Sequence, residues 1–84
     1  MPTLAVIDGI RIEMFYNDHE PAHFHASRGE DSITVTIADL AVYEGEAPPA
    51  MVRKVLDWAA AHQRDLALCW VHCRSGRKPG RIAE

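Results

Sequence analysis

The sequence predicts a single α+β domain, in which N-terminal hairpins form an antiparallel sheet of four to five strands and two C-terminal helices cover one face. Three observations lead to this prediction. Apolar and polar residues alternate over much of the first half, whereas apolar residues recur at helical spacing in the second half. The length of 84 residues leaves room for one hydrophobic core. We therefore expect strands at about 3–44, helices at about 48–75 and a short basic tail at 76–84.

A tight hairpin is expected at the start of the chain. Asp8-Gly9 separates an apolar run at 4–7 from a second run at 10–16, and glycine tolerates the positive φ that a type I′ turn requires. The second run alternates, so its residues fall into two sets on opposite faces of a strand. One set is Ile10, Ile12, Met14 and Tyr16, and the other is Arg11, Glu13 and Phe15.

Two longer strands and a short fifth strand are expected next. Segment 17–21 is rich in turn-forming residues, and the chain then alternates from Ala22 to Ser27, with His23 and His25 on the face opposite Phe24. After a turn at 28–31, residues 32–37 show the clearest alternation in the chain. A short fifth strand at 41–44 would close the sheet.

The second half of the chain shows helical periodicity. Pro48 or Pro49 can open the first helix, because proline is tolerated in the first helical turn. Two apolar stripes follow, and Asp65 could cap the second helix. The stripes are Val52, Val55, Leu56 and Ala59, then Leu66, Cys69, Trp70 and Cys73. We expect two helices with a break near 62–64, or one long bent helix, and both Trp58 and Trp70 in the core.

Charge divides the chain into two parts. The net charge is −3, but residues 1–50 carry 2 basic and 9 acidic groups, whereas residues 51–84 carry 7 basic and 3 acidic groups. An acidic chain is a poor candidate for non-specific binding to a nucleic-acid duplex. The basic residues near the C-terminus could contact RNA or an acidic partner, or form a solvated tail.

The composition also bears on the cellular compartment. Cys69 and Cys73 are four residues apart, which suits a disulfide poorly, and we expect two buried free thiols in a reducing compartment. The apolar stretches fall well short of the ~20 residues that span a bilayer. The sequence opens without a basic and then apolar leader. We therefore expect a cytoplasmic protein that does not enter membranes.

Histidines gather on the face of the sheet that the helices leave open. Hairpin geometry would pair Phe15 with His23 and Glu13 with His25, and would place Thr34 and Thr36 opposite His25 and His23. The residues that would share this face are Arg11, Glu13, Phe15, His23, His25, Ser27, Thr34 and Thr36. Directly opposed side chains lie roughly 4.5–5.5 Å apart at Cβ, so these groups could act together.

One chemistry that suits this face is metal-free acid–base catalysis. His23 and His25 would be the acid and base, because imidazole titrates near neutral pH in its unperturbed state. Glu13 would orient His25, and Arg11 would hold an anion such as a phosphate. The four residues would then be a catalytic site able to cleave RNA.

Metal binding and docking are the other two chemistries. A His-x-His pair on a strand aims both imidazoles the same way, so His23 and His25 could chelate a divalent metal such as zinc. His19 or Glu13 would be the third ligand. The same face could instead dock a protein, and the simplest alternative is that the histidines are solvated strand residues.

The segment from Asn17 to His25 resembles the bacterial domain-of-unknown-function family number 4160. The resemblance covers nearly the whole chain, and its most specific part is Asp-His-x-Pro-x-His-Phe-His. It implies a short cytoplasmic protein, often encoded beside another small protein, as in a type II toxin–antitoxin pair. The resemblance implies no catalytic role for any residue, so His19, His23 and His25 carry over only as candidate site residues.

These observations leave two classes of function open. The first hypothesis is a toxin-like component, such as a ribonuclease, that uses His23, His25, Glu13 and Arg11. The alternative is a non-catalytic binding module, such as an antitoxin or accessory partner, or a metal-binding protein. The expected partners are a small protein encoded nearby, RNA, or a second copy of the chain in a homodimer.

Overall fold

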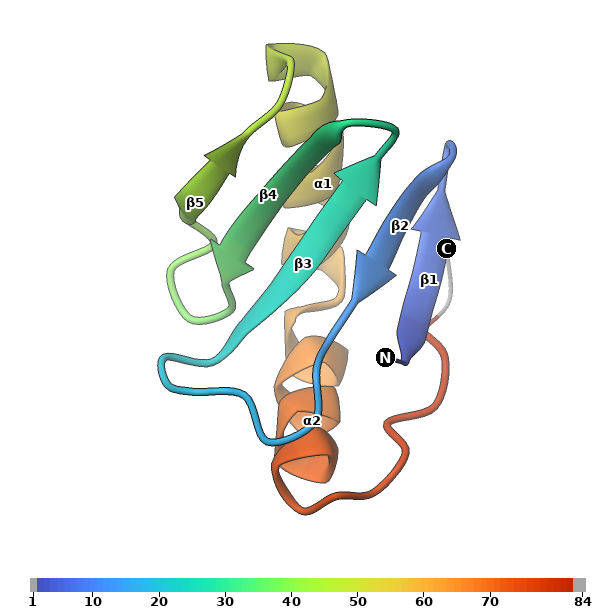
Figure 1. Cartoon of the computed structure of the whole chain (residues 1–84), viewed down its shortest axis with the longest axis vertical. Helices are drawn as coiled ribbons and strands as arrows, with labels where there is room; N and C mark the ends of the chain where they lie inside the picture. The colour runs from blue at the N-terminus through green and yellow to red at the C-terminus, as the bar shows by residue number, and fades with distance from the viewer. Residues whose placement is uncertain (1, 83–84) are drawn as a thin grey trace.

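Five antiparallel strands lie side by side in chain order, and two helices cover one face of the sheet they form (Figure 1). The structure, a computed structural model, describes residues 2–82. The strands are β1 (Thr3–Ile7), β2 (Ile10–Glu13), β3 (His23–Arg28), β4 (Asp31–Thr36) and β5 (Val42–Glu46), and the helices are α1 (Pro49–Ala61) and α2 (Gln63–Arg74). The predicted α+β fold is therefore confirmed, with five strands and two separate helices.

The ends of the elements follow the local sequence signals with two exceptions. Asp8 and Gly9 both have positive φ, 48° and 77°, as a type I′ turn between β1 and β2 requires. Pro49 is the first residue of α1, as predicted. The prediction that Asp65 caps α2 is wrong, because the cap position is His62 and Asp65 lies in the first turn. The second strand is also shorter than predicted and ends at Glu13.

The register between the central strands is the predicted one. Glu13 pairs with His25, and on the other side of β3 His25 pairs with Thr34 and His23 with Thr36. The predicted pairing of Phe15 with His23 does not form, because β2 has already ended. The alternation of the sequence therefore fixes the faces of β3, but not the path of the chain that enters it.

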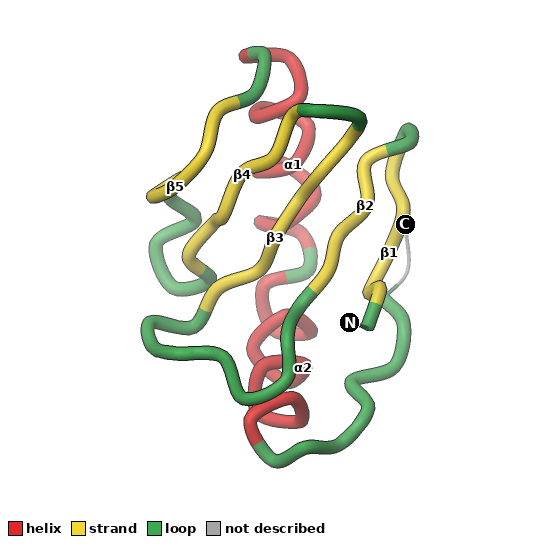
Figure 2. Tube along the Cα trace, in the orientation of Figure 1, coloured by secondary structure: helices red, strands yellow, loops and turns green. Residues whose placement is uncertain are grey.

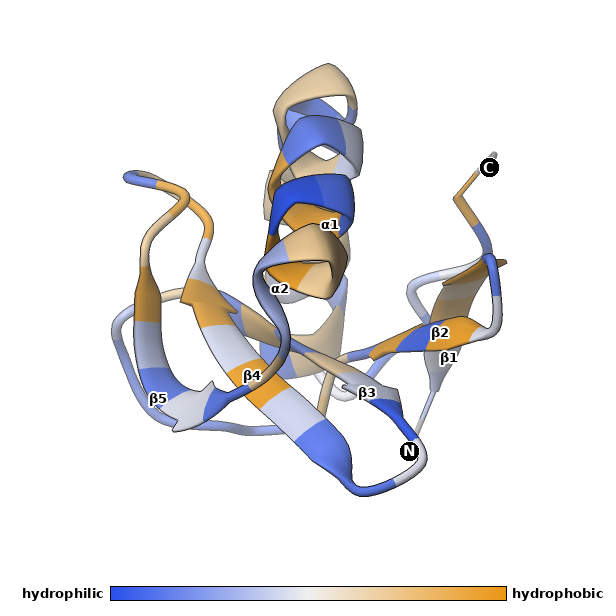
Figure 3. Ribbon diagram, turned by 90° about the horizontal axis from the view of Figure 1, so that it is seen from above, coloured by the Kyte–Doolittle hydropathy of each residue, from blue (hydrophilic) through white to orange (hydrophobic). Residues whose placement is uncertain are grey.

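The core lies between the concave face of the sheet and the two helices, and Figure 3 shows the sheet curving around the helices. Both tryptophans, Trp58 and Trp70, are buried there, as predicted. The helices contribute Met51, Val55, Trp58, Ala59, Leu66, Cys69, Trp70 and Cys73. Of the described helices, neither is long and apolar enough to cross a lipid bilayer.

The segment after α2 is not a purely solvated tail. It runs back along β1 (Figure 1), where the Ile82 amide donates to the Leu4 carbonyl at 2.7 Å and the Ile82 side chain is buried in the core. This contact covers the outer edge of β1. β5 is the strand at the opposite edge of the sheet, and all five of its residues are exposed.

Candidate metal-binding site

The loop between β2 and β3, residues 14–22, positions the site. Figure 2 shows this loop crossing α2, and two contacts with the end of that helix hold it there. The Asn17 amide donates to the Cys73 carbonyl at 3.3 Å, and the Arg74 guanidinium donates to the Glu20 carboxylate at 3.1 Å. The loop is thereby held against the first residue of β3, and it brings Asp18 over two histidines.

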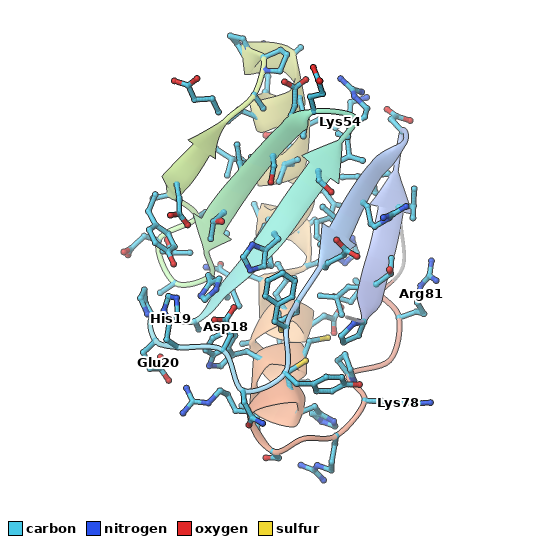
Figure 4. All side chains as sticks on the ribbon, in the orientation of Figure 1. Asp18, His19, Glu20, Lys54, Lys78 and Arg81 are labelled. Carbon is cyan, nitrogen blue, oxygen red and sulfur yellow. The ribbon has the colours of Figure 1, made fainter. Side chains whose placement is uncertain are left out.

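Asp18, which is labelled in Figure 4, contacts both histidines of the cluster. One carboxylate oxygen, Oδ2, lies 2.8 Å from His23 Nε2 and 3.5 Å from His25 Nε2. The other oxygen, Oδ1, accepts a hydrogen bond of 2.9 Å from the His19 backbone N–H. The Asp18 side chain is only 14% exposed. Two imidazoles from one strand thus converge on a single oxygen supplied by the loop.

His23 is enclosed on all sides. It is 1% exposed, and its ring contacts the rings of Trp70 and His25, each with a centroid distance of 5.1 Å. Its second nitrogen, Nδ1, donates to the Pro21 carbonyl at 2.6 Å. The expectation of His23 on an open, solvated face is therefore wrong, since the loop and α2 cover this end of the strand.

His25 lies at the accessible side of the cluster. Its side chain is 22% exposed, and the ring of Phe15 stacks on it with a centroid distance of 4.2 Å. Its Nδ1 lies 3.3 Å from the Thr34 hydroxyl, which can donate or accept a hydrogen bond. Phe15 and Thr34 together fix the plane of the ring, with Nε2 aimed at Asp18.

The electrostatics of Asp18 favour its ionised form. Burial raises the pKa of the carboxyl group, but the hydrogen bonds from the His19 amide, His23 and His25 outweigh it and lower the pKa below its usual value. A carboxylate and a carbonyl can only accept hydrogen bonds. Both ring nitrogens of His23 therefore face acceptors, Nδ1 the Pro21 carbonyl and Nε2 the Asp18 carboxylate.

Three residues offer ligand atoms close enough for one metal ion: Asp18, His23 and His25. Their ligand atoms all lie within 4.8 Å of one another. Nitrogen from imidazole and oxygen from carboxylate are ligands for zinc and for other divalent first-row metals. In addition, both Nδ1 atoms have a polar partner, as is usual for histidines that bind a metal through Nε2.

The other predicted site residues lie outside this group. His19, a predicted metal ligand, has a side chain that is 73% exposed, and its Nε2 is 3.7 Å from Asp18 Oδ1. Glu13 pairs with His25 in the ladder, but within residues 2–82 neither the Glu13 nor the Arg11 side chain hydrogen-bonds a histidine. Arg11 pairs with Ser27, two residues further along β3. Of the four predicted catalytic residues, the structure therefore brings His23 and His25 into ring contact and pairs Glu13 with His25, whereas Arg11 lies further along the strand.

Sequence reasoning missed Asp18 as a site residue. Its place in a segment of turn-forming residues indicates only a turn, although it belongs to the same motif as the histidines. Alternation along a strand cannot place a loop residue, because its position depends on the contacts of the loop with α2. The available signal was a carboxylate five and seven residues before two histidines on one face of a strand.

Comparison with known proteins gives a family and no characterised relative. The family described as Domain of unknown function (DUF4160) matches residues 9–76. The matched segment spans most of the chain, from the end of the first turn to the end of α2, so the chain belongs to this family. No curated protein and no solved structure matches the chain.

Proposed function

We propose that this member of the DUF4160 family is a divalent-metal-binding protein whose ligands are Asp18, His23 and His25. One observation carries the proposal: Nε2 of both histidines converges on one oxygen of Asp18, while Nδ1 of each has a separate partner. This is the arrangement in which a metal ion can replace the shared protons with little movement of the rings. Zinc is the metal that we would test first.

The ligand set also suggests what the metal could do. Three protein ligands would leave one position of a four-coordinate zinc ion for water or a substrate. Because the His25 side chain is partly exposed, water or a substrate could reach a metal ion held by this cluster. A zinc-bound water has a lowered pKa and can serve as a nucleophile, so the site suits hydrolysis.

The alternative hypothesis is a metal-free ribonuclease of a toxin–antitoxin pair. It requires both His23 and His25 to exchange protons with a substrate. His23 suits that role less well than a metal-binding role, because it is 1% exposed and both of its ring nitrogens already have partners. The metal proposal uses the same two histidines and depends on neither Arg11 nor Glu13.

The test is a zinc titration of the purified full chain after treatment with a chelator. We expect one zinc ion per chain, measured by competition with a chromophoric chelator. Asp18→Asn, which keeps the size of the side chain, should weaken binding at least tenfold, as should His25→Ala. His72→Gln is the matched control, because His72 lies outside the cluster, and it should bind as the wild type does.

A separate arm tests which third ligand is used. His19→Ala should keep most of the affinity if Asp18 is the third ligand, and should lose it if the predicted three-histidine set binds the metal. Zinc binding that is absent, or equally strong in Asp18→Asn and in the wild type, would overturn the proposal. Thermal unfolding gives a second readout, since ligand at 100 times its Kd adds about 2.7 kcal/mol.

A further inference from the structure

Apart from the proposed metal-binding cluster, a groove lies between the N-terminal strand and the segment after α2. The groove has a volume of about 350 Å³. Its lining residues are Pro2, Thr3, Tyr16, Lys78, Pro79, Gly80 and Arg81. It shares no residue with the metal cluster, although Tyr16 directly follows Phe15, whose ring stacks on His25.

Tyr16 supplies a flat apolar surface in this groove. It is 41% exposed, and its side chain makes no hydrogen bond or ring contact with another residue of the described part of the chain. Pro2 and Pro79 add apolar walls that carry no amide donor. An exposed aromatic ring that shares a groove with two prolines suits a planar, apolar group that stacks on it.

Two cations stand at the rim of the same groove. Lys78 and Arg81 lie on the same side of the molecule, and Figure 4 shows both side chains extending outward from the segment after α2. Both residues are exposed. Gly80, between them in the chain, has a φ of +82°. No neighbouring atom lies within 4 Å of the position that a β-carbon would take there, so this part of the groove is not filled. None of the described residues that line the groove is acidic, so these cations can bind a phosphate without competition from a carboxylate of the lining.

From this combination we propose that the groove binds a nucleoside phosphate, with the base stacked on Tyr16 and the phosphate held by Lys78 and Arg81. Stacking on aromatic rings and electrostatic contact with phosphate are the two interactions by which proteins bind single-stranded nucleic acid. A free mononucleotide and a nucleotide within a single strand present this same chemistry.

The binding test uses fluorescence anisotropy of a fluorescein-labelled oligoadenylate of eight nucleotides, with AMP and inorganic phosphate as competitors. Tyr16→Leu should weaken binding about tenfold, in line with the value of one stacked base, whereas Tyr16→Phe should keep it. Lys78→Gln with Arg81→Gln should weaken binding and reduce its salt dependence, by a slope of about 0.7 for each phosphate that is no longer neutralised. The double variant Arg53→Gln, Arg64→Gln removes the same charge elsewhere and should bind normally.

The competitors separate the outcomes. Competition by AMP but not by phosphate supports the proposal, and the oligonucleotide decides whether the nucleotide is free or part of a strand. Equal competition by phosphate and AMP, or unchanged binding in Tyr16→Leu, would overturn it. Because no groove residue is a proposed metal ligand, zinc affinity should be unchanged in these variants, which keeps this result independent of the proposed function.

Discussion

Replacing Asp18 with asparagine should destabilise the protein even when no metal is present. The carboxylate accepts hydrogen bonds from the His19 amide at 2.9 Å and from His23 at 2.8 Å, and it has a longer contact of 3.5 Å with His25. Asparagine keeps the size of the side chain, but its amide nitrogen cannot accept a hydrogen bond and its oxygen carries no charge. The contacts to His23 and to the loop amide therefore weaken together.

The size of this effect follows from the number and burial of the contacts. A hydrogen bond to a charged group contributes about 1.5–3 kcal/mol, and the third contact, at 3.5 Å, is too long to add much. We expect a loss of about 2 kcal/mol in the free energy of unfolding. In a domain of this size, that loss lowers the melting temperature by about 8–16 °C.

The assay is urea and thermal unfolding in the presence of a chelator, at pH 7. Asp57→Asn is the control, because Asp57 is exposed on α1 and its substitution should change stability by less than about 0.5 kcal/mol. An Asp18→Asn variant that loses no more than this control would refute the reasoning. It would mean that the convergence of the two histidines on the carboxylate contributes no stability.

The pH dependence of the same cluster has a definite sign. The pKa of Asp18 is lower in the folded protein than in the unfolded chain, because burial, which raises it, is outweighed by the hydrogen bonds to the carboxylate. The stability gained from Asp18 is therefore present above the unfolded pKa of about 3.9 and is lost as the pH falls through the folded value. The difference between wild type and Asp18→Asn should persist at pH 7 and shrink below about pH 4. A difference that grows on acidification would contradict this assignment.

Substitutions elsewhere in the fold have equally definite expected results. Gly45→Ala should cost more than about 1 kcal/mol in chemical unfolding, because Gly45 has a φ of +87° and a β-carbon there would meet the Ser32 carbonyl oxygen. Burial, with smaller effects of Cys73 and Asp65, raises the pKa of Cys69 to about 11, so the native thiol should react with a disulfide reagent far more slowly at pH 8 than the unfolded chain does. Arg74→Ala should change stability by less than about 1 kcal/mol, since its pair with Glu20 is largely exposed, yet weaken zinc binding severalfold by loosening the loop.

The parts of the fold that the sequence predicts are those set by short-range signals. Asp8-Gly9 forms its turn because both residues take positive φ, and alternation places His25 opposite Glu13 and Thr34. Each of these features depends only on residues of a single hairpin. The strand faces and register could therefore be derived without knowing where the helices lie.

The features that could not be predicted depend on contacts between distant parts of the chain. His23 has the predicted pairing with Thr36 but is buried, because Trp70 reaches it from α2. Asp18 is placed by a loop that is held by Cys73 and Arg74, more than fifty residues further along the chain. Likewise, the burial of Ile82 depends on its bond to Leu4, at the other end of the chain.

The three proposed metal ligands and the contacts that hold them in place come from different parts of the chain. All three proposed ligands come from a stretch of eight residues, 18–25, that a ribosome completes before it reaches α2. The residues that hold them in place, Trp70, Cys73 and Arg74, emerge about fifty residues later. A nascent chain therefore carries the donor atoms long before it can hold them in one arrangement. Tight metal binding would thus mark the completion of the fold, and the affinity gap between a peptide of residues 17–26 and the whole domain would measure the contribution of preorganisation.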